Sequence, residues 1–353
     1  MAYQQVSSCR FFIDHLLWLK TLGMEYTLPS GGSTYIQGNA TTENLIGLNP
    51  TNSKLINPEG YTPEYNAYLK WEAAPQIWNT DTDKWKAYIA VLGHNSSSAG
   101  GKLKFYHWTG SDEPTLMSSL PAINYDHYSS APYDGFTLAY DFSSAGNAIS
   151  INFDPVDATY SKDFYVGCIS HGNYFDLQAP NLSLTQSIEY AESKEITTYN
   201  GSSMSNTFIS KQPNWAGGLG AWEINNPNSQ YQQNQKLARS GRRSWSLKFS
   251  FIDSGSLFGP NQLLSDYLEV GTTGYDADDV NDDLSAFTNN LLTDDNFFSQ
   301  VWSKTLGGTL PFILQPNKDE NTFAICRFKD NSLKATQTAP NVYDISLKIE
   351  ETW

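Results

Sequence analysis

The sequence predicts an all-β protein: a jelly-roll-like β-sandwich and a second β-sandwich domain with one short helix, preceded by an N-terminal helical arm. Charged residues make up only 17% of the 353 residues and aromatic residues reach 14%, a usage typical of twisted sheets joined by polar turns. Short alternating segments recur about every ten residues along most of the chain. We expect the helix and arm in 1–63, the jelly-roll in 64–186 and the second β-domain in 187–353.

The first element is predicted as an amphipathic helix over residues 9–23, CRFFIDHLLWLKTLG. Gly23 stands where a helix usually ends, and apolar residues recur at spacings of three and four. The members of this stripe are Phe12, Leu16, Leu19 and Leu22, widened by Leu17 and Trp18. The stretch from Thr27 to Pro63 is polar and rich in Gly, Asn, Thr and Pro. We expect an extended arm that lies against the β-domains or a neighbouring subunit.

The first β-domain is predicted from a series of strands separated by turn residues, without helices between them. The segments are 86–95 (KAYIAVLGHN), 101–110 (GKLKFYHWTG), 135–155 (GFTLAYDFSSAGNAISINFDP) and 163–184 (DFYVGCISHGNYFDLQAPNLSL). The third contains a strand, a Ser-Ala-Gly-Asn turn and another strand.

The second β-domain begins with a hairpin-like unit over 187–208, SIEYAESKEITTYNGSSMSNTF. Residues 242–252 then alternate, which places four apolar side chains on one buried face: Trp245, Leu247, Phe249 and Phe251. An acidic excursion follows, with helical spacing at its end, where Phe297, Val301 and Leu306 are expected to pack.

The last predicted strands follow two adjacent glycines in KTLGGTLPFILQP, Lys304 to Pro316. The glycines indicate a turn, and the apolar run from Leu310 to Leu314, closed by Pro316, predicts a short core strand. Two more strands are expected in 322–330 (TFAICRFKD) and 342–353 (VYDISLKIEETW), the second with Val342, Ile345, Leu347 and Ile349 as its apolar members.

This order of strands resembles the ring-forming β-domain of distal-tail and tail-tip (baseplate hub) proteins of tailed bacteriophages, in which a long connection holding a helix splits a strand pair. The segments 89–95 (IAVLGHN), 165–177 (YVGCISHGNYFDL) and 182–190 (LSLTQSIEY) also resemble phage structural proteins that carry a jelly-roll of carbohydrate-binding type. The resemblance implies a non-catalytic ring, expected to be hexameric, that contacts the tail tube and tip or fibre proteins. It also implies host surface glycan as a candidate partner.

Composition narrows the partners and the compartment. The formal net charge of -15 combines 22 basic with 37 acidic residues, and this balance argues against nucleic acid as a partner. Three widely spaced cysteines, Cys9, Cys168 and Cys326, predict buried free thiols rather than disulfides. We find neither a signal-peptide pattern nor an apolar run of membrane-spanning length. A product made in the host cytoplasm and released inside a virion is expected.

Candidate catalytic and metal-binding residues do not form a recognised motif, so we expect no enzyme, cofactor or metal site. The five histidines are His15, His94, His107, His127 and His171. A metal site would combine His94 with His107 or His171, but their spacing matches no metal motif. Glycosidase chemistry needs two carboxylates that face one sugar. The candidate carboxylates are the ones near aromatic residues in the sequence: Asp126, Asp134, Asp141, Asp154 and Asp157.

Two further segments suggest binding. The acidic cluster DADDVNDD supplies oxygen ligands through Asp276, Asp278, Asp279, Asn281, Asp282 and Asp283. It lacks the central Gly and terminal Glu of a helix-loop-helix calcium loop, so we expect a solvated loop. Aromatic segments such as NYDHYSSAPYDG, residues 124–135, present rings on which a sugar stacks. A carbohydrate-binding protein is therefore the alternative function, and a β-sandwich glycosidase a third.

Overall fold

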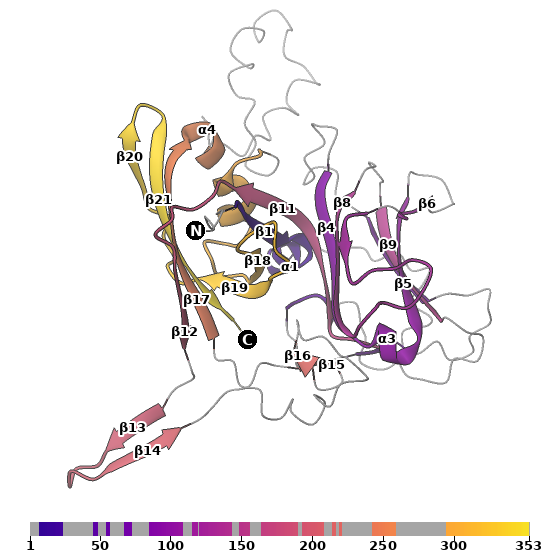
Figure 1. The fold of residues 1–353 in the computed structure, drawn as a ribbon, viewed down its shortest axis with the longest axis horizontal. Coiled ribbons are helices and arrows are strands. Elements are labelled where there is room, and N and C mark those ends of the chain that lie inside the picture. The colour runs from indigo at the N-terminus through magenta and orange to yellow at the C-terminus, as the bar shows by residue number, and fades with distance from the viewer. Residues whose placement is uncertain are drawn as a thin grey trace, which may run out of the picture.

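The computed structural model confirms the all-β class (Figure 1). It describes residues 7–23, 45–48, 54–56, 67–72, 85–108, 115–118, 120–142, 148–155, 164–189, 193–207, 214–216, 219–220, 242–258 and 294–352. Among these residues, none belongs to a helix with the length and apolar character needed to cross a membrane. The acidic cluster from Asp276 to Asp283 lies outside the described residues.

One large antiparallel sheet runs through the molecule. Its strands, in spatial order, are β12 (Thr185–Glu189), β17 (Arg242–Asp253), β21 (Val342–Glu351), β19 (Ala324–Phe328), β18 (Phe312–Gln315), β1 (Cys9–Asp14), β11 (Cys168–Leu177), β4 (Trp85–His94), β8 (Gly135–Phe142) and β7 (Ala122–Ile123), with β20 (Ala335–Ala339) paired to β21. Strand β12 spans the predicted domain boundary at 186/187 and belongs to the same large sheet. The division into domains at 63/64 and 186/187 stays a prediction.

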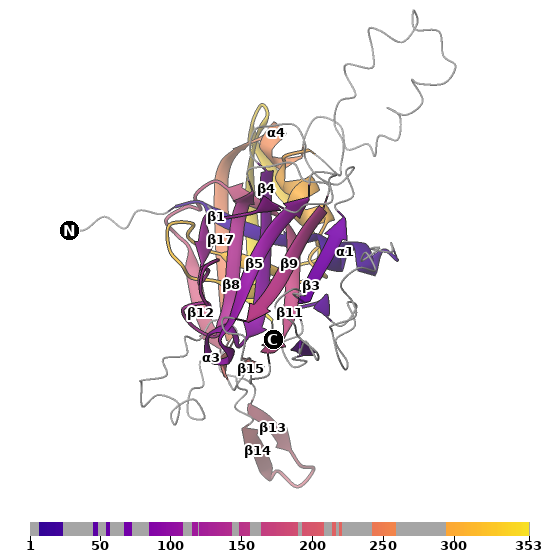
Figure 2. The ribbon, with the colours of Figure 1, turned by 90° about the vertical axis from the view of Figure 1, so that its right-hand side faces the viewer.

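A second, four-stranded sheet covers part of the first. Its order is β3 (Ala67–Glu72), β9 (Ala148–Pro155), β5 (Gly101–Trp108) and β6 (Thr115–Leu116). Figure 2 shows β5, β9 and β3 in front of strands of the large sheet. The sequence predicted β8 and β9 as successive strands, which is confirmed, but they lie in different sheets. Leu103, Phe105 and Ile151 from one layer meet Ile89 and Val91 from the other in a common core.

The remaining elements are short. Helices are α1 (His15–Thr21), α3 (Ser96–Ala99), α4 (Ser254–Leu257) and a π-helical turn, η6 (Phe298–Ser303). Two-stranded pairs are β2 (Lys54–Ile56) with β10 (Phe164–Val166), β13 (Ser193–Thr197) with β14 (Ser203–Thr207), and β15 (Asn214–Ala216) with β16 (Leu219–Gly220). The predicted hairpin-like unit in 187–208 is therefore present as β13 and β14.

The predicted N-terminal helix is wrong in its first half. Residues 9–14 form β1, a strand at the middle of the large sheet between β11 and β18, and only His15–Thr21 is helical. All six residues of β1 are buried, because Phe11 faces one core and Phe12 the opposite one. A strand with two buried faces is a continuous apolar run, which periodicity does not separate from a buried helix.

Little of the predicted arm lies in the described residues. Leu45 is buried in the core between the two sheets, Ile46 bridges to Ile169, and β2 pairs with β10. These pieces of the segment from Thr27 to Pro63 pack against the first β-domain.

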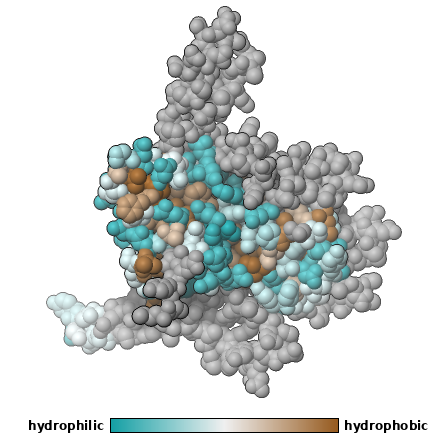
Figure 3. Space-filling view, turned by 45° about the horizontal axis from the view of Figure 1, so that its top comes forward, coloured by the Kyte–Doolittle hydropathy of each residue, from teal (hydrophilic) through white to brown (hydrophobic). Residues whose placement is uncertain are grey.

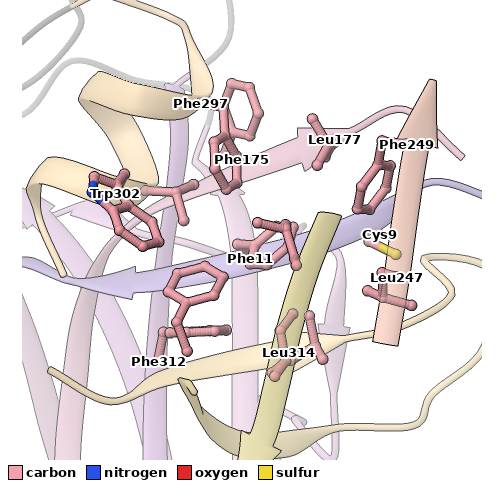
Figure 4. Close-up of a cluster of buried hydrophobic side chains, with 14 of the residues drawn as sticks. Cys9, Phe11, Phe175, Leu177, Leu247, Phe249, Phe297, Trp302, Phe312 and Leu314 are labelled. Atoms are coloured by element: carbon pink, nitrogen blue, oxygen red, sulfur yellow. The ribbon is translucent and has the colours of Figure 1, made fainter. Parts of the chain in front are cut away.

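The stretch with two glycines forms the core strand that the sequence predicted. Phe312 and Leu314 of β18 are completely buried, and Phe11 lies at the centre of the same cluster (Figure 4). Gly307 and Gly308 both have positive φ, 65° and 89°. A Cβ on Gly308 would lie 2.7 Å from Cβ of Phe328, so the turn needs glycine there for space and for backbone conformation.

The segment before this turn covers the core. Phe297 and Val301 are completely buried, as predicted, whereas Leu306 is half-buried and packs with Leu310 on the helix α1 residues Trp18 and Leu19. The end of the excursion thus closes one face of the sheet.

Candidate functional site

Within the described part of the chain, the candidate histidines lie in separate surroundings. His94 and His171 are both buried, and burial lowers the pKa of each to about 4. His94 Nε2 lies 2.9 Å from Thr137 Oγ1, and its Nδ1 accepts a hydrogen bond from Ser96 N. The ring of His127 lies 3.8 Å from that of Tyr128, centre to centre and tilted, and the side chain of His107 lies outside the described residues. The described residues contain no group of three metal-ligating side chains.

The candidate carboxylates lie in different surroundings. Asp126 accepts hydrogen bonds from Tyr128 N and Ser129 Oγ in its own loop. Asp134 is buried, and Asp141 accepts a hydrogen bond from the hydroxyl of Tyr174. The side chain of Asp154 and all of Asp157 lie outside the described residues.

The start of α1 holds an unpredicted cluster of buried titratable groups. Asp14 caps the helix, its Oδ1 accepting a hydrogen bond from Leu17 N at 3.0 Å, and burial raises its pKa to about 7. His15 beside it is fully buried, and its pKa is well below the usual value because of that burial. Gly172 allows β11 to approach the end of β1 closely, because a Cβ at this position would lie 1.9 Å from Ile13 O.

Lys304 completes the same buried region from the other end of the chain. Its ammonium donates a hydrogen bond to Gln300 Oε1 at 2.8 Å and lies 6.0 Å from the centre of the Trp18 ring. Burial lowers the pKa of Lys304 to about 7. The side chains of Asp14, His15 and Lys304 are all buried. We therefore interpret them as structural residues in the packing between β1, α1 and η6.

A second polar cluster joins β1, β8 and β11. Arg10 forms a two-point ion pair with Asp176, with distances of 2.6 and 2.9 Å, and its guanidinium lies 4.2 Å from the ring centre of Tyr174 and 5.1 Å from that of Tyr140. Tyr174 in turn donates to Asp141. Each member is engaged by another member, which favours a structural clamp.

The aromatic loop expected to meet sugars is ordered by local contacts. Tyr125 stacks on Phe105 with ring centres 4.8 Å apart, and Asn124 hydrogen-bonds to the backbone of Tyr133 and Phe136. Tyr128 alone points into solvent, with 77% of its surface exposed. One ring is therefore available to a ligand from this loop.

The exposed end of the large sheet provides the larger candidate surface. All five side chains of β12 are exposed, and among the described strands β12 pairs only with β17. The segment before β12 continues along β17, where Asn181 N donates to Lys248 O at 2.7 Å. Gln186 and Ile188 oppose Trp245 and Arg243 in register. Strand β12 therefore extends the core-facing side of the sheet beyond the core.

Exposed apolar side chains gather at this edge, which we call the β12 edge (residues 178–189 and 242–253). Four of the seven large hydrophobic side chains that are exposed in the described residues belong to it: Leu182, Leu184, Ile188 and Phe251. On the face shown in Figure 3, hydrophobic residues form small patches between hydrophilic ones. The β12 edge is thus distinguished by how many such side chains it collects.

Phe251 was expected in the core, and the structure places it outside. A bulge between Phe249 and Ile252 shifts the register of β17 against β21, so Ile252 is buried and Phe251 is 77% exposed with φ of 62°. Asp344 holds the bulge by accepting hydrogen bonds from Phe251 N and Ser250 Oγ. Alternation alone predicted the wrong face, because a bulge adds one residue to the pattern.

The apolar residues 182–188 of the β12 edge had a weak signal in the sequence. Leu182, Leu184 and Ile188 share the period of two of a strand. The same period is typical of core strands, so the pattern did not indicate that these side chains face solvent.

Comparisons with known proteins leave the family open. No protein-family model matches the chain, and no curated protein matches it. A solved structure described as "CpGH89CBM32-6 produced by Clostridium perfringens" is 14% identical, covering 39% of this chain and 88% of that chain, with a TM-score of 0.26. A likeness with so low a TM-score carries no argument about this chain.

Proposed function

We propose that the chain is a non-catalytic structural subunit of a bacteriophage tail, a distal-tail or baseplate ring that joins the tail tube to the tip or fibres. Copies of the chain meet along the β12 edge. The subunit is made in the host cytoplasm and leaves the cell within the virion. The order of strands in the sequence, which resembles ring-forming tail proteins, supports this assignment.

The single observation that carries the proposal is the exposure of β12 and its apolar neighbours. An open edge strand offers unpaired backbone groups to another chain, and proteins that stay monomeric blunt such edges with lysine, proline or a bulge. Strand β12, Thr-Gln-Ser-Ile-Glu, contains neither lysine nor proline. In a closed ring the next subunit covers each edge, which removes the liability.

The experiment is sedimentation velocity and negative-stain imaging of the purified protein. We expect rings for the parent, and loss of rings for the double variant Leu182→Asp and Ile188→Asp. Both side chains are already exposed, 83% and 55%, so the melting temperature should change little. The two added carboxylates, in a chain whose net charge is already -15, instead create repulsion between copies.

The matched control is Leu22→Asp with Tyr128→Asp, which replaces exposed hydrophobic residues away from the β12 edge. This control should assemble like the parent. A parent that stays monomeric at every concentration tested contradicts the proposal, and so does equal loss of assembly in both double variants.

Carbohydrate binding is a second candidate, favoured by the exposed ring of Tyr128 on its ordered loop. Aromatic faces stack on the apolar faces of sugars, and Asp126 accepts a hydrogen bond from Tyr128 N in the same turn. Tyr128→Ala should abolish glycan binding measured on an immobilised glycan panel. The control is Tyr199→Ala, which removes a tyrosine that is even more exposed to solvent elsewhere. Equal binding by both variants, or none by the parent, removes this candidate.

A further inference from the structure

The hairpin of β13 and β14 stands away from the rest of the molecule. Figures 1 and 2 both show it projecting from the body of the protein below β12. Its two strands pair over five residues, from Ser193 opposite Thr207 to Thr197 opposite Ser203. In the described residues these strands form a sheet of their own. An isolated two-stranded hairpin is only marginally stable in water, so this one needs a surface to rest on.

The turn of the hairpin is well defined and presents one aromatic ring. Thr198 N donates to Ser202 O at 2.8 Å, Gly201 N donates to Thr198 O at 2.9 Å, and Gly201 has φ of 78°. Tyr199 in this turn is completely exposed. A rigid turn with an outward tyrosine is suited to contact, because an aromatic side chain loses little conformational entropy when it is buried.

We propose that this hairpin is an arm that docks on a neighbouring copy of the chain, an inference that rests on the proposed ring. Only residues 190–192 separate β12 from β13. A molecule seated on the β12 edge therefore lies within reach of the arm, whose five-residue strands extend about 16 Å.

Charge identifies a second copy as the partner. Residues 197–207 contain no charged side chain, although the whole chain carries -15. An acidic protein that binds a basic partner places carboxylates at the contact, whereas an uncharged surface favours contact between two acidic copies, because facing like charges cost free energy. The tip of the arm, residues 197–207, is uncharged and therefore suits contact with a second copy.

The test uses Tyr199→Cys in the full chain. All three natural cysteines are completely buried, so the new thiol is the accessible site for a maleimide that carries a photo-crosslinker. Isotope-labelled and unlabelled chains are mixed before illumination, and crosslinked peptides are identified by mass spectrometry. We expect crosslinks that join labelled to unlabelled chains.

A second variant replaces residues 193–207 by a flexible glycine-serine linker of equal length. Because β13 and β14 pair only with each other among the described strands, the melting temperature should stay unchanged. The concentration for half-assembly should rise by about tenfold or more.

The outcomes separate the arm from the ring. If the parent forms rings that the linker variant forms equally well, and crosslinks stay within one chain, the arm is overturned and the proposed function stands. If the parent forms no rings, both fail. Crosslinks only to proteins other than this chain, in phage-infected lysate, also overturn the arm proposal.

Discussion

The ring of Phe11 in β1 lies 5.6 Å from the ring of Phe312 in β18, so the two ends of the chain share one hydrophobic core. Phe328 is 4.8 Å from Phe312, and Phe297 is 5.8 Å from Phe11. The N-terminal strand thus stabilises the C-terminal strands of the large sheet, and loss of any ring in this cluster should weaken the packing of both ends of the chain.

Phe312→Ala should destabilise the protein strongly. The ring is completely buried, so its removal leaves a cavity that costs about 3 to 5 kcal/mol. We expect a lower melting temperature in calorimetry and loss of assembly, while Phe251→Ala, which removes an exposed ring, should melt like the parent. A Phe312→Ala protein that melts with the parent would show that β18 is not a core strand.

Stability should fall as the pH drops from about 6.5 towards 4. In the unfolded chain a histidine binds its proton near pH 6.5, but burial holds the folded pKa of His94 and of His171 at about 4. The unfolded state therefore binds more protons in this window, which favours unfolding. Each histidine contributes up to about 3 kcal/mol.

Asp14 acts in the opposite direction in the same window. Its folded pKa is raised to about 7, so the folded state keeps a proton that the unfolded state loses, and stability from this group falls as pH rises from about 4 to 7. The histidines outnumber it. His94→Gln should therefore flatten the dependence of unfolding free energy on pH between 4 and 6.5, measured by urea denaturation. An unchanged slope contradicts the role of His94.

Gly172→Ala should unfold the junction between β1 and α1. An added Cβ lies 1.9 Å from Ile13 O, and a backbone atom has no room to move, so we expect a loss of about 3 kcal/mol or more. Gly100→Ala is the matched control, because its φ is 73° with open space around it, and it should cost about 1 kcal/mol. Equal melting temperatures of the two variants would contradict the close approach.

Arg243 and Glu351 should behave as a coupled pair. Glu351 is buried, and both of its carboxylate oxygens accept hydrogen bonds from Arg243. Arg243→Ala removes the guanidinium and leaves the buried carboxylate only the backbone N–H of residue 243, at a cost of about 3 to 5 kcal/mol. The double variant Arg243→Met with Glu351→Leu should recover most of that loss in thermal unfolding. Additive losses would show that the pair does not interact.

The sequence alone determined the fold class and most of the strands, because alternation and turn residues are local properties of the chain. It identified the core strand after the two glycines, the alternating strand β17 and the hairpin of β13 and β14. The sequence-based prediction was wrong for two strands, each for a physical reason. Strand β1 is buried on both faces and lost its period of two, and the bulge in β17 moved Phe251 from the expected core face to solvent.

Only the tertiary structure decided which apolar residues are covered. Leu182, Leu184 and Ile188 have the pattern of a core strand, and they are exposed because β12 overhangs the core at the end of the sheet. The grouping of Asp14, His15 and Lys304 is also a tertiary result. Residues from the two ends of the chain meet there because β1 lies between β11 and β18. Burial by segments distant in the sequence, which no local pattern predicts, sets their pKa values.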